Sequence, residues 1–512
     1  MSFEDVSRAL NTLVKGVSEV YRGYYQYMMI EAVFCGMMLG QPTLLIGSHG
    51  TFKTSMANFI GSLFDKPVVI LSEKFSSRKA LEDFFEDVGG KIGVDKNRLM
   101  RNLAGGVNVE YEQAGGELMV NVEVDAVRYA GAKKLGDPVR RPLEIFSIQV
   151  NDQMDPEDIL GYAIDHPALL GMRPPHAVKR GRLAGADYIV LDEIFNAPRL
   201  LSKIHHALNE KVVDTTIGPI EVAPVAWLLA TNPLNEFYQT NIKLTNVATL
   251  DRYALSARSL PPSIQEILLM VERWKKLRVS KRAPIELIYE ARKALSEVAI
   301  PDEYIYFSLA LVSHLSRCYF STSKGERCEE SKDPFEADKD CSLCIYNEYP
   351  CGIANVGKVR TVIMLQQTIR AHALLNMRRE ANKEDLAFAL LTVLPHRLYW
   401  NNREFLSQHG SIFTATKALI EKFAEKFASY GHRIGEIEKV IMKQDVARAL
   451  ELKKEYYDAP ILRAMLDETI DMMKESAKKR ADQQTLTVLE PPLKIDGAIK
   501  VIGDKKPAEQ TQ

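Results

Sequence analysis

The stretch TLLIGSHGTFKT, residues 43–54, decides the fold. Its first four residues form a short apolar run that ends at a glycine-rich turn, which predicts a buried strand feeding a loop. Residues 55–64, SMANFIGSLF, resume an apolar spacing of three and four, which predicts a helix packed on a sheet. A strand, a loop and a helix in this order frame a phosphate-binding site.

The loop residues suit the binding of nucleotide phosphates. Glycines let the backbone curl so that successive N–H groups point at phosphate oxygens, at a helix N-terminus that favours anions. Lys53 is expected to reach the β- and γ-phosphates, and the Thr54 hydroxyl to ligate Mg²⁺. Phe52 departs from the strict pattern, which has glycine at that position. The predicted loop comprises Gly47, Ser48, His49, Gly50, Thr51, Phe52, Lys53 and Thr54.

Two adjacent carboxylates follow a second apolar run. Residues 188–191, YIVL, predict a strand that ends in Asp192 and Glu193. Asp192 is expected to hold the Mg²⁺ shell, while Glu193 polarises the water that attacks the phosphate. One acidic pair by itself could be a solvated strand end, but the preceding phosphate loop favours the catalytic interpretation.

Two further polar residues are predicted at the same edge of the sheet. The apolar run at 227–230 predicts a strand that delivers Asn232, whose amide can orient the water or sense the γ-phosphate. Arg252 follows a short helical stretch, where it can stabilise the charge of the transferring phosphoryl group in a neighbouring subunit. The set therefore predicts ATP hydrolysis with Mg²⁺.

The remaining pattern predicts an α/β core followed by helical regions. Strand candidates at 143–150, 188–191 and 225–230 favour a parallel sheet with helices on both faces. Alternating runs around Gly115-Gly116 predict a β-hairpin in an insertion at about 73–140, which could contact a neighbour or a client or be structural elaboration alone. The predicted divisions are a core at 1–265, a mostly helical region at 266–400, amphipathic C-terminal helices at 401–480 and a loosely held tail at 481–512.

Composition limits the class of protein. The 512 residues are 46% hydrophobic and 26% charged, which is ordinary for a soluble protein of several domains. Lysine and arginine total 66 against 67 acidic residues, so the net charge of −1 gives no global reason to expect nucleic acid or an anionic membrane as a partner. Because the apolar stretch at 27–47 is broken by Glu31, Gln41 and Pro42 and lacks a signal-peptide layout, we expect a cytoplasmic protein without membrane contact.

A collinear set of motifs resembles the MoxR branch of the AAA+ ATPases, including its RavA-like members. The resemblance covers roughly residues 20–400 with interruptions, and alanine is usual in that branch at the position of Phe52. The motifs that carry it, in chain order, are Gly50–Thr54, Gln149–Gly161, Leu191–Pro198, Ala230–Pro233, Leu250–Arg252, Gly357–Arg360, Asn382–Leu386 and Pro395–Leu398.

The resemblance implies an αβα nucleotide-binding core with a helical lid at 266–400, assembled into a ring that is usually a hexamer. Such rings hydrolyse ATP at subunit interfaces and remodel or assemble client proteins in a chaperone-like way, commonly with a von Willebrand factor A-domain partner. Gly161–Arg182 lies where this branch carries a helix-2 insertion that faces the central pore, although an ordinary surface loop is the alternative.

The resemblance also implies roles for single residues. Arg258 is the runner-up to Arg252 as the finger, because helix ends near Pro261 could present either arginine. The implied roles are Lys53 and Thr54 for nucleotide and Mg²⁺, Asp192 for the metal, Glu193 for the water, Asn232 as sensor 1, Arg252 as the finger acting in trans and Arg360 as sensor 2.

Five of the six cysteines fall between Cys318 and Cys351, which indicates a local metal site in a reducing compartment. One CxxC pair flanked by two single cysteines, with Pro350 before the last, is similar to the iron–sulfur sites of CRISPR-associated and recombination nucleases. We therefore expect a [4Fe–4S] cluster, with Zn²⁺ as the alternative and free thiols on a solvated loop as the unliganded case. The expected ligands, on a polar insertion at about 320–355, are Cys328, Cys341, Cys344 and Cys351. Cys35 and Cys318 are expected to be small core residues.

Two other functions fit parts of the pattern. A DNA-acting AAA+ ATPase, related to the replicative helicase branch, would suit a lid insertion with a metal cluster. Against it, the sequence has no dense stripe of lysine and arginine with interleaved aromatic residues. A nucleotide-gated scaffold with little turnover is the second alternative, and the complete catalytic set argues against it because a scaffold has no need of Glu193 beside Asp192.

Overall fold

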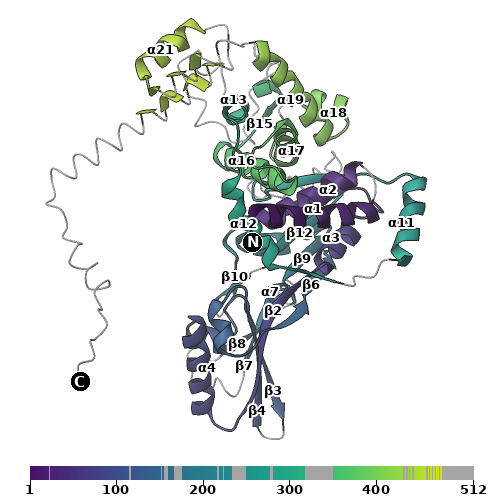
Figure 1. Cartoon of the computed structure of the whole chain (residues 1–512), viewed down its shortest axis with the longest axis vertical. Helices are drawn as coiled ribbons and strands as arrows, with labels where there is room; N and C mark the ends of the chain where they lie inside the picture. The colour runs from purple at the N-terminus through teal and green to yellow at the C-terminus, as the bar shows by residue number, and fades with distance from the viewer. Residues whose placement is uncertain are drawn as a thin grey trace, which may run out of the picture.

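The computed structural model places the core in the middle of the molecule, a second, mostly antiparallel sheet below it and the C-terminal helices above it (Figure 1). It describes residues 1–21, 24–114, 117–151, 153–154, 159–165, 176–180, 182–215, 218–222, 224–232, 250–276, 281–316, 350–400, 402–429, 433, 436–437, 439–440, 443–456, 459, 462–463, 465–467, 469–471 and 473–474.

The core is built on a five-stranded sheet with the order β13-β1-β12-β9-β6, in which every neighbouring pair is parallel. Numbered along the chain, its strands therefore lie in the order 5-1-4-3-2. The strands predicted at 143–150, 188–191 and 225–230 are confirmed as β6, β9 and β12. The five strands are β1 (Thr43–Gly47), β6 (Ile145–Gln149), β9 (Tyr188–Asp192), β12 (Ala226–Thr231) and β13 (Leu255–Ser259).

Helices cover both faces of this sheet. In β1, Leu45 packs into the core that holds α1, α2 and the lid helices, while Leu44 and Ile46 pack into a second core with α8. Alternate residues of one strand thus fill two cores, which gives the three-layer αβα arrangement. The helices of this region are α1 (Phe3–Val20), α2 (Tyr24–Leu39), α3 (Lys53–Ser62), α7 (Arg182–Gly185) and α8 (Pro198–Glu210), with the 3₁₀ turn η3 (Ile194–Asn196).

A second sheet, with the order β14-β2-β4-β3 and with β5 beside β2, is inserted between α3 and β6. Its hairpin pairs Val107 with Val124, where the alternating sequence predicts it, but β2 begins already at Phe64, before residue 73. A separate core that includes Phe85 and Val122 fills the space under α4. The elements are β2 (Phe64–Phe75), α4 (Arg78–Ile92), α5 (Lys96–Met100), β3 (Val107–Ala114), β4 (Glu117–Asp125), η1 (Ala130–Lys134), β5 (Val139–Pro142) and β14 (Ala283–Pro284).

Two short hairpins complete the strands. The first pairs β7 with β8 in antiparallel register, so the segment expected to be a pore insertion or a surface loop contains paired strands. The second pairs β10 with β11 behind α8. Their bounds are β7 (Gly161–Asp165), β8 (His176–Arg180), β10 (Val212–Thr215) and β11 (Gly218–Glu221).

The rest of the described chain is mostly helical, and its helices α12 and α16 pack on α1 and α2. Ser7 Oγ donates to Leu374 O over 2.6 Å, and Asn11 Nδ2 donates to Leu375 O over 3.1 Å, so α1 holds the end of α16. No helix in the described part of the chain is both long and apolar enough to cross a membrane. The elements are α11 (Ile264–Lys276), α12 (Glu286–Ala294), η4 (Leu295–Glu297), α13 (Asp302–Ser316), α15 (Pro350–Ile353), β15 (Ala354–Asn355), α16 (Lys358–Leu375), α17 (Lys383–Val393), β16 (Tyr399–Trp400), α18 (Arg403–His409), α19 (Ile412–Ser429) and α21 (Val446–Glu455).

Candidate active site

The phosphate loop connects β1 to α3, and its glycines have identifiable reasons. A Cβ on Gly47 would lie 2.4 Å from Ser259 O, so β13 leaves no room for a side chain there. Gly50 adopts φ 74°, a left-handed conformation that favours glycine. Ser259 Oγ donates to Thr51 O over 2.8 Å and ties the loop to β13. The loop is therefore held against the sheet edge with its backbone curled.

Phe52 occupies the position at which the strict motif has glycine. Its φ of 62° lies in the left-handed region, which explains why glycine suits this position and shows that Phe52 is strained there. Its ring meets that of Tyr21 edge-on, with the centroids 6.4 Å apart. Aromatic packing against Tyr21, the residue that follows α1, therefore compensates for part of the backbone strain.

Lys53 begins α3 and its side chain is buried, with 6% exposure. Its Nζ donates to Gly47 O over 2.6 Å and to Ser48 O over 3.0 Å. Burial lowers the pKa of Lys53, and the carboxylates of Asp192 and Glu193 offset this only in part. The loop thus encloses a cation that lacks enough negative charge around it, which favours an anion such as a phosphate.

Thr54 and Asp192 lie together, as the sequence predicts. Thr54 Oγ1 donates to Asp192 Oδ2 over 2.6 Å, and Asp192 Oδ1 accepts from the backbone N–H of Glu193 over 3.0 Å. Mg²⁺ prefers oxygen ligands and is usually held by one or two carboxylates together with phosphates and water. A hydroxyl and a carboxylate beside the phosphate loop fit that ion.

Glu193 and Asn232 form a buried pair at the end of β9 and β12. Asn232 Nδ2 lies 2.9 Å and 3.0 Å from the two carboxylate oxygens of Glu193. Asn196 Nδ2 donates to Glu193 Oε2 over 3.2 Å, a contact that sequence reasoning missed although the spacing of three residues allows it. Glu193 has a φ of 58°, and strained backbone of this kind concentrates at active sites.

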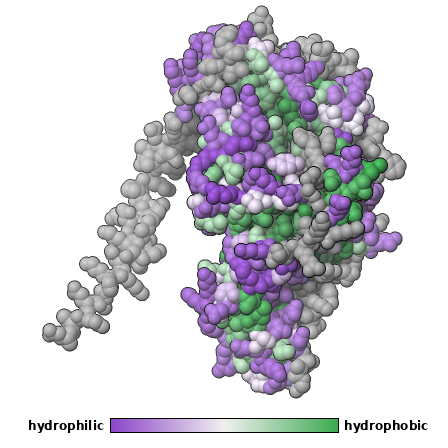
Figure 2. Space-filling model, turned by 45° about the vertical axis from the view of Figure 1, so that its right-hand side comes forward, coloured by the Kyte–Doolittle hydropathy of each residue, from purple (hydrophilic) through white to green (hydrophobic). Residues whose placement is uncertain are grey.

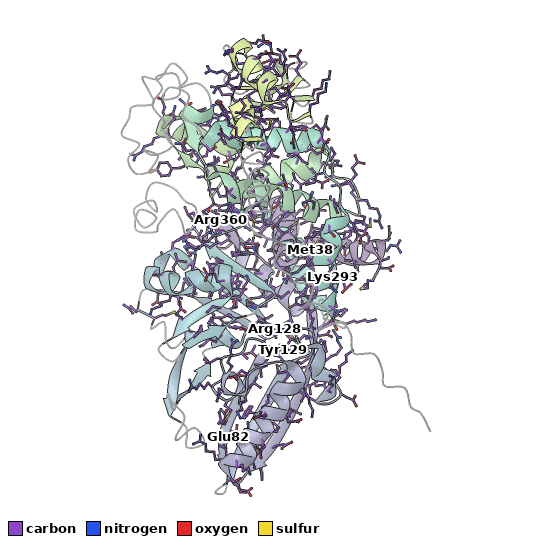
Figure 3. The ribbon with its side chains drawn as sticks, turned by 90° about the vertical axis from the view of Figure 1, so that its left-hand side faces the viewer. Met38, Glu82, Arg128, Tyr129, Lys293 and Arg360 are labelled. Carbon is purple, nitrogen blue, oxygen red and sulfur yellow. The ribbon has the colours of Figure 1, made fainter. Side chains whose placement is uncertain are left out.

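The arginines expected in the site have other contacts in this single chain. Arg360 Nη1 lies 3.1 Å from Asp251 Oδ2, at the junction of core and lid (Figure 3). Arg397 also holds Asp251, over 2.7 Å, and burial lowers the pKa of Arg397 to about 10. Arg258 Nη1 donates to Thr414 Oγ1 of α19 over 3.5 Å. Arg252 is half-buried just before β13, and its role in trans stays a prediction.

The predicted cysteine site lies almost entirely outside the described residues. Cys351 stands in α15, whereas Cys328, Cys341, Cys344 and Cys318 fall in 317–349, which the structure does not describe. Among the described side chains, no three histidine, cysteine, aspartate or glutamate residues gather as a metal site. Cys35 is a buried free thiol, which confirms its prediction as a core residue.

Comparisons with known proteins bear on the lid and on the fold. Residues 349–413 match the family described as the AAA lid domain. The chain is similar in structure to a protein from Cytophaga hutchinsonii that is described as a candidate ATPase, with a TM-score of 0.50 and 18% sequence identity over 82% of this chain and 96% of that one. No curated protein matches the chain. The structural likeness shows the fold, an α/β core with a parallel sheet and a helical lid.

Proposed function

We propose that this chain, which the lid match and the shared fold support as an AAA+ ATPase, hydrolyses ATP to ADP and phosphate with Mg²⁺ as a MoxR-like ring motor. The observation that carries the proposal is one sheet edge that holds Lys53, the Thr54–Asp192 pair and the Glu193–Asn232 pair. Each pair joins residues far apart in sequence, and each has the chemistry of one part of phosphoryl transfer.

The roles follow from the side chains. Lys53 supplies positive charge to the phosphates from inside the loop, and Thr54 with Asp192 would hold Mg²⁺, which neutralises phosphate charge when bound. Glu193 accepts a proton from the attacking water, because its carboxylate lies at the same edge. Asn232 orients Glu193 through its amide hydrogens.

The test is the pair Glu193→Gln and Lys53→Ala in the full chain. Glu193→Gln should keep nucleotide binding and lose about two to four decades of turnover, the range typical of removing a positioned proton acceptor. Lys53→Ala should instead weaken binding itself, because the charge contacts phosphates before the reaction. Turnover of Glu193→Gln at the wild-type rate would show that another group is the base.

Assembly into a ring, usually a hexamer, belongs to this proposal. Four apolar side chains at helical spacing on α11 are exposed, which supports contact with a second copy of the chain: Ile264, Ile267, Leu268 and Val271. Figure 2 shows apolar surface on the side of the molecule that carries α11.

If Arg252 acts in trans, mixed Arg252→Ala and Glu193→Gln subunits should regain activity that neither has alone. If no activity is recovered although subunit exchange is proven, Arg252 does not act in trans, and Arg258 becomes the candidate finger.

We propose that ATP hydrolysis drives the remodelling or assembly of a client protein in the cytoplasm. A von Willebrand factor A-domain protein is one candidate partner. The β7–β8 hairpin supports a pore-facing insertion, because the resemblance places one at this point of the chain. The Glu193→Gln variant, which should bind ATP without hydrolysing it, is expected to retain a bound client. Affinity purification of this variant from the native host should therefore recover the client. Steeply salt-dependent retention on DNA would instead favour the helicase-like alternative.

A metal centre in the lid completes the proposal. Anaerobically purified protein should absorb broadly near about 400 nm if Cys328, Cys341, Cys344 and Cys351 hold a [4Fe–4S] cluster. The absorbance should disappear in a Cys341→Ser, Cys344→Ser double variant. A colourless preparation with one zinc per chain would favour Zn²⁺, and one with neither metal would remove the site.

A further inference from the structure

One side chain of the phosphate loop touches the Glu193–Asn232 pair. His49 Nε2 lies 3.2 Å from Asn232 Nδ2, and His49 Nδ1 lies 3.7 Å from Glu193 Oε1. The His49 side chain is 78% exposed, whereas Glu193 and Asn232 are buried. An exposed group at the tip of the loop thus reaches two buried groups at the ends of β9 and β12.

The positions of the hydrogens follow from the acceptors. A carboxylate of Glu193 cannot donate, so the nitrogen of the Asn232 amide must face it, which fixes the orientation of that amide. Its two hydrogens then serve Glu193 and His49 Nε2, and Nε2 accepts. The neutral ring of His49 consequently carries its own hydrogen on Nδ1, the atom that faces Glu193 Oε1.

Asn232 has one polar atom left over. Its Oδ1 is buried and has no hydrogen-bond partner within the described part of the chain. An unpartnered buried acceptor costs free energy until a donor arrives, and the attacking water is such a donor. These contacts therefore describe the nucleotide-free arrangement, which we call the resting arrangement. In it both amide hydrogens of Asn232 are donated, to Glu193 and to His49, and Oδ1 of Asn232 has no donor within the described part of the chain.

We propose that His49 is a positioning residue that signals the presence of a terminal phosphate to Glu193. This inference rests on the proposed function. A γ-phosphate at the loop offers oxygens that accept hydrogen bonds. His49 Nδ1, which at 3.7 Å is too far from Glu193 Oε1 for a hydrogen bond, can donate to them, and they compete with His49 Nε2 for the second hydrogen of Asn232. ATP therefore loosens the resting arrangement, and ADP, which lacks the γ-phosphate, leaves it in place.

The test compares diphosphate and triphosphate binding without turnover. Dissociation constants of ADP and of a non-hydrolysable ATP analogue are measured for the wild-type full chain, His49→Ala and His49→Gln. His49→Ala should keep the ADP constant within about twofold and weaken the triphosphate analogue by about tenfold, the loss of one hydrogen bond to a charged group. His49→Gln should restore most of the preference, because its amide can both accept from Asn232 and donate.

Four results are decisive. An unchanged ratio of the two constants in His49→Ala overturns the inference, and so does equal weakening of ADP, which would indicate a damaged loop. ATP turnover measured on the same preparations separates the two proposals. A wild-type chain that binds both nucleotides through Lys53 but never hydrolyses ATP contradicts the proposed function. In that case the ratio of the two dissociation constants still decides the role of His49. Binding of neither nucleotide overturns both.

Discussion

Two buried lysines, Lys53 in the phosphate loop and Lys66 in the inserted sheet, are both 6% exposed. Lys66 Nζ lies 2.6 Å from Asp187 Oδ1, with Asp125 and Glu123 at 3.6 Å and 3.9 Å. Lys53 Nζ has only backbone carbonyls within hydrogen-bond distance among its described partners. Equal burial thus comes with very different electrostatic surroundings.

The difference separates a structural charge from a functional one. Burying an ammonium group is costly unless an opposite charge lies beside it. Lys66 has that charge and joins β2 to the turn before β9, whereas burial lowers the pKa of Lys53 because its nearest carboxylates only partly offset the cost. The negative charge that the phosphate loop lacks is the charge a nucleotide brings.

The largest expected effect comes from Lys66→Met. This change removes the cation nearest to Asp187, and Arg141 is then the one cationic partner of Asp187 that remains in the described part of the chain. Because a largely buried carboxylate loses much of its compensating charge, we expect the free energy of unfolding to fall by about 3 kcal/mol. Denaturant unfolding measures the loss, and nucleotide affinity of the folded fraction should stay unchanged. The double variant Lys66→Met, Asp187→Asn is the control, since it also removes the stranded charge and should lose less than the sum of the single changes. An unchanged stability would show that Lys66 is not a structural ion pair.

Lys53→Met should have the opposite profile. Removal of the undercompensated charge should leave the unfolding free energy of the nucleotide-free protein unchanged or slightly higher. ADP affinity should fall by about 100-fold, because a charge-assisted contact to phosphate is lost. Calorimetric titration and denaturant unfolding of one preparation test both halves. Loss of stability equal to that of Lys66→Met would erase the distinction between the two lysines.

The sequence predicts the region of Lys53 better than that of Lys66. Strands β9 and β12 stand out as apolar runs because both of their faces are buried. Strand β2, FDKPVVILSEKF, was missed because Pro67 and charged residues at both ends hide its pattern. Its length moves the start of the inserted sheet back from residue 73 to Phe64.

The site shows the same limit on a smaller scale. The contacts of Thr54 with Asp192 and of Asn232 with Glu193 agree with the predicted convergence of strand ends. The contact of His49 with Asn232 and the hold of Arg397 on Asp251 were not predicted. Such pairs join side chains across the fold and leave no periodic signal in the sequence.

Backbone strain gives a smaller contrast between the two regions. Asn102 near the inserted sheet has a φ of 57°, but its side chain bonds both the N–H and the carbonyl of Val109, so the strain is locally compensated. The backbone of Phe52 is also left-handed, with a φ of 62°, and its ring packs against that of Tyr21. Phe52→Gly should therefore be more stable than Phe52→Ala by about 1 kcal/mol, since both lose the ring but only alanine keeps the strain. Thermal unfolding of the two variants decides, and equal stabilities would show that position 52 is relaxed.

The smallest expected effect is a proton taken up on binding. Burial lowers the pKa of Lys53 below its usual 10.5 in the nucleotide-free protein, so at alkaline pH part of the population is neutral. A phosphate beside Nζ favours the charged form and raises that pKa again. ADP binding should therefore take up a fraction of a proton in the pH range just below 10.5, and affinity should fall as pH rises through it. Calorimetry in buffers of different ionisation enthalpy measures the uptake. Lys66→Met should retain it and Lys53→Met should lose it, and uptake that survives in Lys53→Met would assign the proton to another group.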